Sequence, residues 1–218
     1  MPPPTSSRQD REHEIVAAAR RLFDERGTQD APIEEVAKAV GIARGLIYRH
    51  FSSKEELFFL TVTDYLAELS ELLEMAVTAD EDPVRQLERV TQAYAGFCQR
   101  YPAFLDASLA LMRRPARELN EMVSESVWLR LGQGMAQCLD QVAQVLRRGT
   151  EQGVFAVDDP DYTATVLWTS TLGTMHLARL GIGVRQLGPA VPGVFRVTPE
   201  RVVATCVENA LAAAGATS

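Results

Sequence analysis

Apolar residues recur along most of this chain at the three-and-four spacing of amphipathic helices. The first such run, from Ile15 to Phe23, is followed by Gly27, a residue that readily takes the left-handed conformation at a helix C-terminus. No segment competes convincingly with the alternation of apolar and polar residues that indicates a half-buried strand. The pattern therefore predicts an all-α fold.

Two short helices are expected next. Asp30 is placed to cap a second helix with Pro32 in its first turn, and Gly41 ends that helix. A third helix is expected from about Ala43 to His50. Together the three helices form a compact N-terminal unit.

Capping residues and prolines divide the rest of the chain. Ser53 with Glu56 forms a capping box, so a long fourth helix is expected to run to about Met75. Residues 181–197 contain four Gly and two Pro and are expected to form a loop. The other expected helices span residues 82–100, 103–113, 115–152, 159–180 and 198–214.

The second and third helices have the residue spacing of a helix-turn-helix. Ala37 is small where the helices would cross, and Gly41 accepts the positive φ of a tight turn. An ordinary helical hairpin packed in a core is the alternative. The outer face of the third helix, however, offers residues with little reason to be buried: Arg44, Gly45, Leu46, Tyr48, Arg49 and His50. Since arginine pairs with guanine edges and phosphates, and tyrosine can donate to phosphate, this face predicts contact with double-stranded DNA.

The net charge of −7 argues against a nucleic-acid partner until its distribution is considered. Residues 1–52 hold eight basic and eight acidic side chains, and residues 53–218 hold fourteen and twenty-one. The excess negative charge therefore belongs to the later part of the chain. DNA binding by the N-terminal unit stays open.

The segment from Gly41 to Leu57, GIARGLIYRHFSSKEEL, together with the preceding helix that ends at Gly27, resembles the DNA-binding segment of the tetracycline-repressor (TetR) family. The resemblance covers residues 11–57. It implies an all-α homodimer that binds a palindromic operator through two helix-turn-helix units. It also implies a helical domain, here residues 58–218, that dimerises, binds a small-molecule effector and releases DNA; residues 1–10 are expected to be a disordered tail.

The resemblance also assigns expected roles to residues. Tyr48 and Lys54 fall where the family commonly contacts phosphate, while Arg44, Gly45 and Arg49 fall on its recognition helix. The chain departs from the pattern at several positions, which are Ala31, Pro32, Ala43 and Leu46, where hydroxyl residues are common. Leu46 can contact a thymine methyl but cannot hydrogen-bond a base, so the operator sequence does not follow from relatives.

The effector cavity is expected between the helices of the larger domain. Long apolar stripes and an aromatic cluster are first of all core residues, but cavities between helices need similar walls. The candidate lining residues are Tyr94, Phe97, Phe104, Trp128, Met135, Trp168, Thr171, Met175 and His176. Tyr94, Thr171 and His176 are the candidate polar anchors, although a helix histidine without a ligand is the more common case. Nearly all of these walls are apolar, which predicts a small, largely apolar effector.

The dimer interface is expected on residues 159–180 and 198–211. The first segment is apolar on much of its circumference, and small residues between its large side chains allow close approach of another helix. Two such helices from each protomer would form a four-helix interface. Alternatively, they only close the core of the monomer.

Other functional classes lack residues to name. The three cysteines, Cys98, Cys138 and Cys206, are spaced like reduced core thiols, which suits the cytoplasm. The three histidines show no metal-ligand spacing, no catalytic set or cofactor motif occurs, and no window has the length of a membrane span. A ligand-responsive repressor is therefore the leading hypothesis, and no enzyme activity, metal or cofactor is expected. The alternatives are an α-helical carrier or enzyme, or a regulator that acts through protein contacts.

Overall fold

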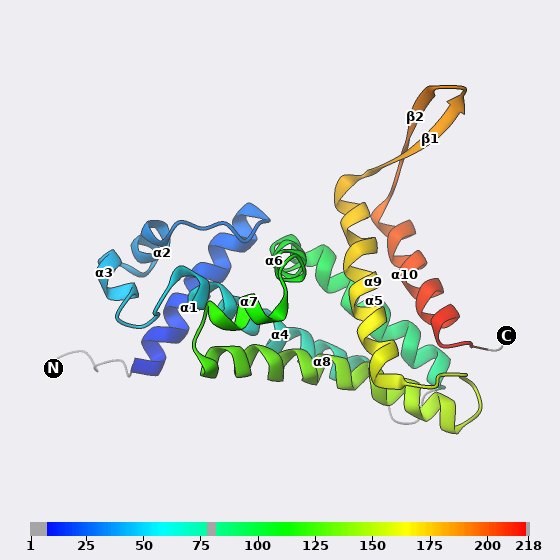
Figure 1. Ribbon diagram of the computed structural model, residues 1–218, viewed down its shortest axis with the longest axis horizontal. Helices are drawn as coiled ribbons and strands as arrows, with labels where there is room; N and C mark the ends of the chain where they lie inside the picture. The colour runs from blue at the N-terminus through cyan, green and yellow to red at the C-terminus, as the bar shows by residue number, and fades with distance from the viewer. Residues whose placement is uncertain (1–7, 78–81, 217–218) are drawn as a thin grey trace.

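The computed structural model describes residues 8–77 and 82–216 and has two lobes joined by one long helix. The small lobe consists of α1 (Arg8–Arg26), α2 (Ile33–Val40) and α3 (Arg44–Ile47). Helix α4 (Lys54–Ala76) begins beneath this lobe and continues into the large one (Figure 1). The large lobe contains α5 (Pro83–Arg100), α6 (Pro102–Met112), α7 (Ala116–Glu121), α8 (Glu125–Glu151), α9 (Pro160–Leu180) and α10 (Pro199–Ala213).

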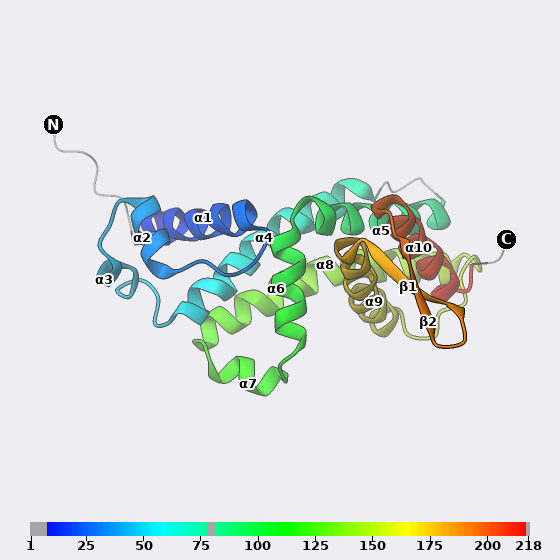
Figure 2. The same ribbon diagram turned by 90° about the horizontal axis from the view of Figure 1, so that it is seen from above.

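The large lobe is built around the pairing of α4 with α8. These helices pack along each other, α5 packs against both of them, and α9 packs against α8. Helices α9 and α10 lie side by side at the end of the molecule opposite to the small lobe (Figure 1). Helices α6 and α7 form a corner on one side of the α4–α8 pair, between the two lobes (Figure 2). This corner positions the cavities described below.

Several helix ends follow directly from local sequence chemistry. The Ser53 hydroxyl accepts a hydrogen bond from the Glu56 amide at 3.0 Å, as the capping box predicts. The Asp159 carboxylate accepts from the Tyr162 amide at 3.0 Å at the start of α9. Gly41 ends α2 with a φ of 76°, a conformation that glycine takes at little cost. The predicted all-α class and these boundaries are confirmed.

The small lobe corrects three expectations. Helix α1 begins at Arg8, so residues 8–10 are helical and do not belong to a tail; residues 1–7 lie outside the described residues. Asp30 does not cap α2, whose N-cap is Pro32 without a side-chain bond, because the Asp30 carboxylate faces Lys54 instead. The third helix has only four residues, and hydrogen-bonded turns continue it to Phe51.

The single helix expected at residues 115–152 is two helices. Helix α7 ends at Glu121, and α8 begins after Ser124, whose backbone is extended. The Ser124 hydroxyl does not cap α8 and lies 2.7 Å from Glu56 Oε1 on α4, a tertiary hydrogen bond. The break was not predictable from helix propensity because its partner lies 68 positions earlier in the chain.

Residues 181–197 form an antiparallel hairpin, which corrects the expected loop. Strand β1 (Ile182–Gly188) pairs with β2 (Val191–Arg196), and Val184 lies opposite Val194. A two-stranded sheet has only edge strands, so the proline and glycines that argued for a loop are tolerated. The hairpin projects beyond α9 and α10 (Figure 1). Its exposed apolar side chains are Ile182, Val184, Leu187, Val191, Val194 and Phe195.

Arg20 of α1 joins the small lobe to α4. Its Nη1 donates to Asp64 Oδ2 at 2.7 Å, and its Nη2 pairs with Glu68. The guanidinium also lies 4.2 Å from the centroid of the Tyr65 ring. Burial by itself would lower the pKa of Arg20, but the hydrogen bonds with Asp64 and Glu68 raise it overall. Arg20 therefore stays charged and fixes α1 on α4.

We expect Arg20→Gln to lower the free energy of unfolding by about 1–2 kcal/mol at pH 7. The loss is smaller than for a fully buried pair because the partner carboxylates stay partly exposed. Burial would raise the pKa of Glu68, but hydrogen bonds from Tyr101 and Arg20 lower it below its unfolded value. The contribution of Glu68 is therefore present above the unfolded pKa of about 4.3 and is lost as the pH falls through the lower folded pKa.

Urea unfolding at pH 7 and at pH 3 measures this effect. The difference between wild type and Arg20→Gln should shrink at pH 3. Arg21→Gln, on the neighbouring exposed position, is the matched control and should change stability by less than about 0.5 kcal/mol at either pH. An Arg20→Gln penalty that stays the same at both pH values would contradict the ion-pair assignment.

Candidate nucleic-acid interface and effector cavity

Helix α3 is held in the small lobe by its inward side chains. Ile47 and Phe51 are each 1% exposed, and they lie in the same core cluster as Val36 and Ala37 of α2. The Ile42 amide donates to the Ala37 carbonyl at 3.0 Å, which closes the turn between the two helices. The opposite face of α3 is consequently presented to solvent as a rigid surface.

This exposed face carries a cation beside an aromatic ring. Arg44 Nη1 lies 2.7 Å from Glu34 Oε1, and its guanidinium carbon lies 5.7 Å from the centroid of the Tyr48 ring. The hydrogen bond with Tyr48 and the charge of Glu34 raise the pKa of Arg44. Leu46 is exposed on the same short helix. An exposed ion pair is worth about 0–1 kcal/mol, so Arg44 can exchange Glu34 for a phosphate or base at little cost.

The other predicted DNA contacts differ in their surroundings. Gly45 and Arg49 are exposed, and Lys54, the first residue of α4, lies 3.3 Å from Asp30 Oδ1. The side chain of His50 is only 18% exposed, and its Nδ1 lies 3.7 Å from Glu12 Oε1 on α1. The structure thus places six of the seven candidates on the exposed surface and turns His50 back toward α1.

Below α3, the carboxylate of Glu56 connects the two lobes. The Glu56 side chain accepts a hydrogen bond from the Ser52 amide in the segment after α3 and another from the Ser124 hydroxyl before α8. Burial would raise the pKa of Glu56, but the hydrogen bond from Ser124 and those from Ser52 lower it, so the group is ionised at neutral pH. One side chain therefore contacts the end of the recognition segment and the start of α8.

Helix α8 leads from this contact to a cavity of about 230 Å³ in the large lobe, here called the core cavity. The core cavity is bounded by α4, α6, the α6–α7 corner, α8 and α9. Its lining residues are Val62, Leu66, Ser108, Leu111, Met112, Arg114, Leu119, Trp128, Leu131, Met135, Trp168 and Leu172. Ten of the twelve are apolar.

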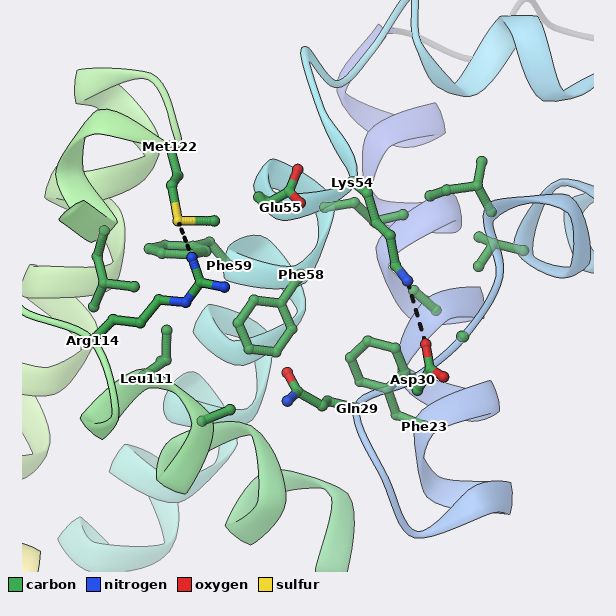
Figure 3. A pocket seen from close by; sticks show the side chains of 17 residues that line it. Phe23, Gln29, Asp30, Lys54, Glu55, Phe58, Phe59, Leu111, Arg114 and Met122 are labelled. Atoms are coloured by element: carbon green, nitrogen blue, oxygen red, sulfur yellow. Dashed lines mark hydrogen bonds and ion pairs between the residues drawn. The ribbon is translucent and has the colours of Figure 1, made fainter.

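A second cavity of about 340 Å³, the seam cavity, lies where the small lobe meets the α6–α7 corner. In Figure 3, Arg114 and Met122 lie on one side of it and Lys54 and Asp30 on the other. Phe58 lies between the two sides. Leu111, Arg114 and Leu119 line both cavities, so the α6–α7 corner separates them.

The core cavity contains only some of the lining residues expected from the sequence. Trp128, Met135 and Trp168 line it, whereas Tyr94 and Thr171 border a void of about 20 Å³ on the other side of Trp168. The Tyr94 ring stacks on Trp168 with centroids 4.3 Å apart, and the Tyr94 hydroxyl is buried without a hydrogen-bond partner. A void of that size holds one water rather than an effector.

The remaining candidates line neither the core cavity nor the seam cavity. Phe97 and Phe104 pack edge to face with centroids 5.1 Å apart and belong to the buried aromatic core. Met175 is buried in the same core, and His176 is exposed on the surface of α9. Sequence reasoning missed Arg114 and Ser108, because neither residue stands out until α6 and α7 fold back over α4.

The cysteines are buried and unpaired, as the sequence predicts. Burial raises the pKa of Cys138 to about 12 and that of Cys206 to about 11, and it also raises the pKa of Cys98. These thiols are poor nucleophiles as a result. In the part of the chain that the structure describes, no group of three potential ligands could hold a metal ion and no helix is long and apolar enough to cross a membrane.

Comparison with known proteins decides the family. A model of bacterial regulatory proteins of the tetR family matches residues 15–60, which span α1 to the start of α4. The chain belongs to the TetR family. This TetR-family protein is 30% identical over 105 residues to the transcriptional regulator HbdR of Aromatoleum sp. (strain CIB), a match that covers 48% of this chain and 44% of HbdR. The chain therefore spans less than half of the length of that relative.

A second relative and a solved structure extend the comparison. The transcriptional repressor KstR2 of Rhodococcus jostii is 28% identical over 161 residues, 72% of this chain and 75% of KstR2. A tetR-family regulatory protein from Rhodococcus RHA1 superposes with a TM-score of 0.68 at 17% identity, and covers 98% of this chain and 100% of its own. The fold is thus that of the family over its full length. These relatives are named as regulators, which is a non-enzymatic role.

Proposed function

We propose that this TetR-family protein is a cytoplasmic transcriptional repressor that binds a palindromic operator as a homodimer. A small, largely apolar effector in the core cavity releases it from DNA. The observation that carries this proposal is the course of α4: its first turn supports the recognition segment through Glu56, and its middle turns line the core cavity through Val62 and Leu66. A ligand that displaces α4 or α8 therefore acts on the position of α3.

Two kinds of DNA contact are proposed. Lys54 and Tyr48 bind phosphates and set the register on any duplex, because phosphates carry no base identity. Arg44 and Arg49 reach base edges in the major groove, where arginine pairs bidentately with guanine. Gly45 allows close approach of the backbone, and Leu46 contacts a thymine methyl. The net negative charge of the rest of the chain keeps binding dependent on this one surface.

The homodimer is proposed to form through α9, α10 and the hairpin. Tyr162 and Leu180 of α9 are 67% and 58% exposed, and the apolar side chains of the hairpin continue this surface. Exposed apolar surface of this extent, continuous with two packed helices, is typical of a subunit interface.

Fluorescence anisotropy with duplex DNA from upstream of the gene and with an unrelated duplex tests the DNA contacts. We expect Lys54→Ala to weaken binding to both duplexes. It should also reduce the slope of log affinity against log salt concentration by about one. Arg44→Ala should weaken the upstream duplex selectively, by about 1–3 kcal/mol.

Arg117→Gln, on the exposed surface of α7, is the control and should leave both affinities unchanged. If wild type binds neither duplex at low salt, DNA binding itself is wrong. If Arg44→Ala and Lys54→Ala weaken both duplexes equally, only the division between base and phosphate contacts is wrong.

Sedimentation at micromolar concentration tests the interface. The wild type should sediment as a dimer, and Val184→Glu with Val194→Glu should weaken the dimer at least tenfold, because the two side chains lie opposite each other on one face of the hairpin. Leu129→Glu, on an exposed apolar position of α8, is the matched control and should dimerise normally. A wild type that sediments only at 24.0 kDa would refute the dimer. A double variant that dimerises like wild type would remove the hairpin from the interface.

A further inference from the structure

The core cavity has one charged group in its wall. Ten of its lining residues are apolar, Ser108 contributes a hydroxyl, and Arg114 contributes a guanidinium. No carboxylate lines this cavity. The charge that this wall offers to a ligand is therefore positive and complements an anionic group.

Arg114 has an unusually weak partner in this structure. Its Nη1 lies 3.3 Å from the Met122 sulfur, and a thioether is a poor acceptor. In the part of the chain that the structure describes, no carboxylate lies within 4.0 Å of it, whereas Arg20, Arg44 and Arg147 each contact one. The guanidinium is therefore available to a ligand.

The position of Arg114 indicates which side of it an anion would occupy. In the seam cavity, Arg114 is accompanied by Lys54, Asp30 and Glu55, so charges of both signs are present there (Figure 3). Phe59, which lines the seam cavity, packs 6.4 Å from Trp128, which lines the core cavity. Asp and Glu residues thus share the lining with Arg114 in the seam cavity but not in the core cavity.

We propose that the effector is a small organic acid, a refinement that rests on the proposed function. Its apolar body occupies the core cavity, and its carboxylate takes a bidentate pair of hydrogen bonds from Arg114. The cavity volume of about 230 Å³ is below the usual range for larger ligands, so the body is compact. Arg114 lies between α6 and α7, and its partner Met122 lies between α7 and Ser124. A bound carboxylate that draws the Arg114 side chain away from Met122 therefore acts on the α7–α8 connection, where Ser124 contacts Glu56.

Paired ligands of equal shape test the charge. Octanoate with octanamide, and 4-phenylbutanoate with 4-phenylbutanamide, are titrated at pH 7.5 while tryptophan fluorescence is recorded. Trp128 and Trp168 are the two tryptophans of the chain, and both line the core cavity. In at least one pair, we expect the acid to bind about tenfold or more tightly than its amide.

Variants assign this preference to Arg114. Arg114→Gln should abolish the advantage of the acid and leave the affinity for the amide unchanged, and Arg114→Lys should retain part of the advantage. Arg113→Gln is the matched control, because Arg113 is the adjacent exposed arginine and lines neither cavity. Arg114 is exposed, so each variant is expected to fold, which circular dichroism checks.

Each contrary result has a distinct meaning. Equal affinity for acid and amide in wild type would overturn the organic-acid proposal and leave the apolar effector in place. If Arg114→Gln lost affinity for the acid and for the amide by the same factor, Arg114 would shape the cavity and would not bind the carboxylate. If no acid or amide binds, the core cavity is not the effector site, and the effector part of the proposed function fails together with this refinement.

Discussion

Helix α4 has to pack against both lobes at the same time, and most of the architecture depends on this constraint. The first turn of α4 is fixed by the Ser53 cap and by Glu56, while Arg20 holds α1 against its middle turns. The same middle turns line the core cavity through Val62 and Leu66, and the helix packs along α8. Because α4 is one continuous helix of about 34 Å, a rigid-body shift of its cavity-lining turns also moves its first turn.

The buried carboxylate of Glu56 determines how the helices meet. Its two oxygens are used by donors from different lobes, the Ser52 amide and the Ser124 hydroxyl. Removing one donor leaves a mostly buried charge with half of its partners, which costs more than a neutral hydrogen bond. The link thus joins the segment after α3 to the start of α8, the helix that contributes Trp128 and Met135 to the cavity wall.

Features with a local cause were predictable from the sequence. The Ser53 cap, the Gly41 turn and the inward stripe of the helix-turn-helix depend on neighbours within a few positions, and the exposed face of α3 follows once that stripe is known. Features that depend on distant partners were not predictable. The break before Ser124 requires Glu56, and the hairpin was hidden because glycine and proline, which usually indicate a loop, are tolerated on edge strands.

The cavity shows the same division. Trp128, Met135 and Trp168 line one cavity, because apolar stripes on α8 and α9 face each other in the bundle. Phe97 and Phe104 lie in the core, and His176 is exposed, because periodicity gives the face of a helix and not the depth of the space beside it. Arg114 could be recognised only after the α6–α7 corner was seen to close over α4.

The central claim is that the effector cavity and the recognition helix are coupled through Glu56 and Ser124. The most direct test measures DNA affinity with and without the tightest-binding carboxylate in wild type, Ser124→Ala and Ser126→Ala; Ser126 is a near neighbour, with its Oγ 3.2 Å from Ser124 Oγ. The account predicts that the ligand weakens DNA binding about tenfold or more in wild type and Ser126→Ala. By linkage, DNA weakens ligand binding by the same factor. In Ser124→Ala this coupling factor should fall below about threefold, while the variant still binds the carboxylate alone and DNA alone. A full coupling factor in Ser124→Ala, or none in wild type, would contradict the account.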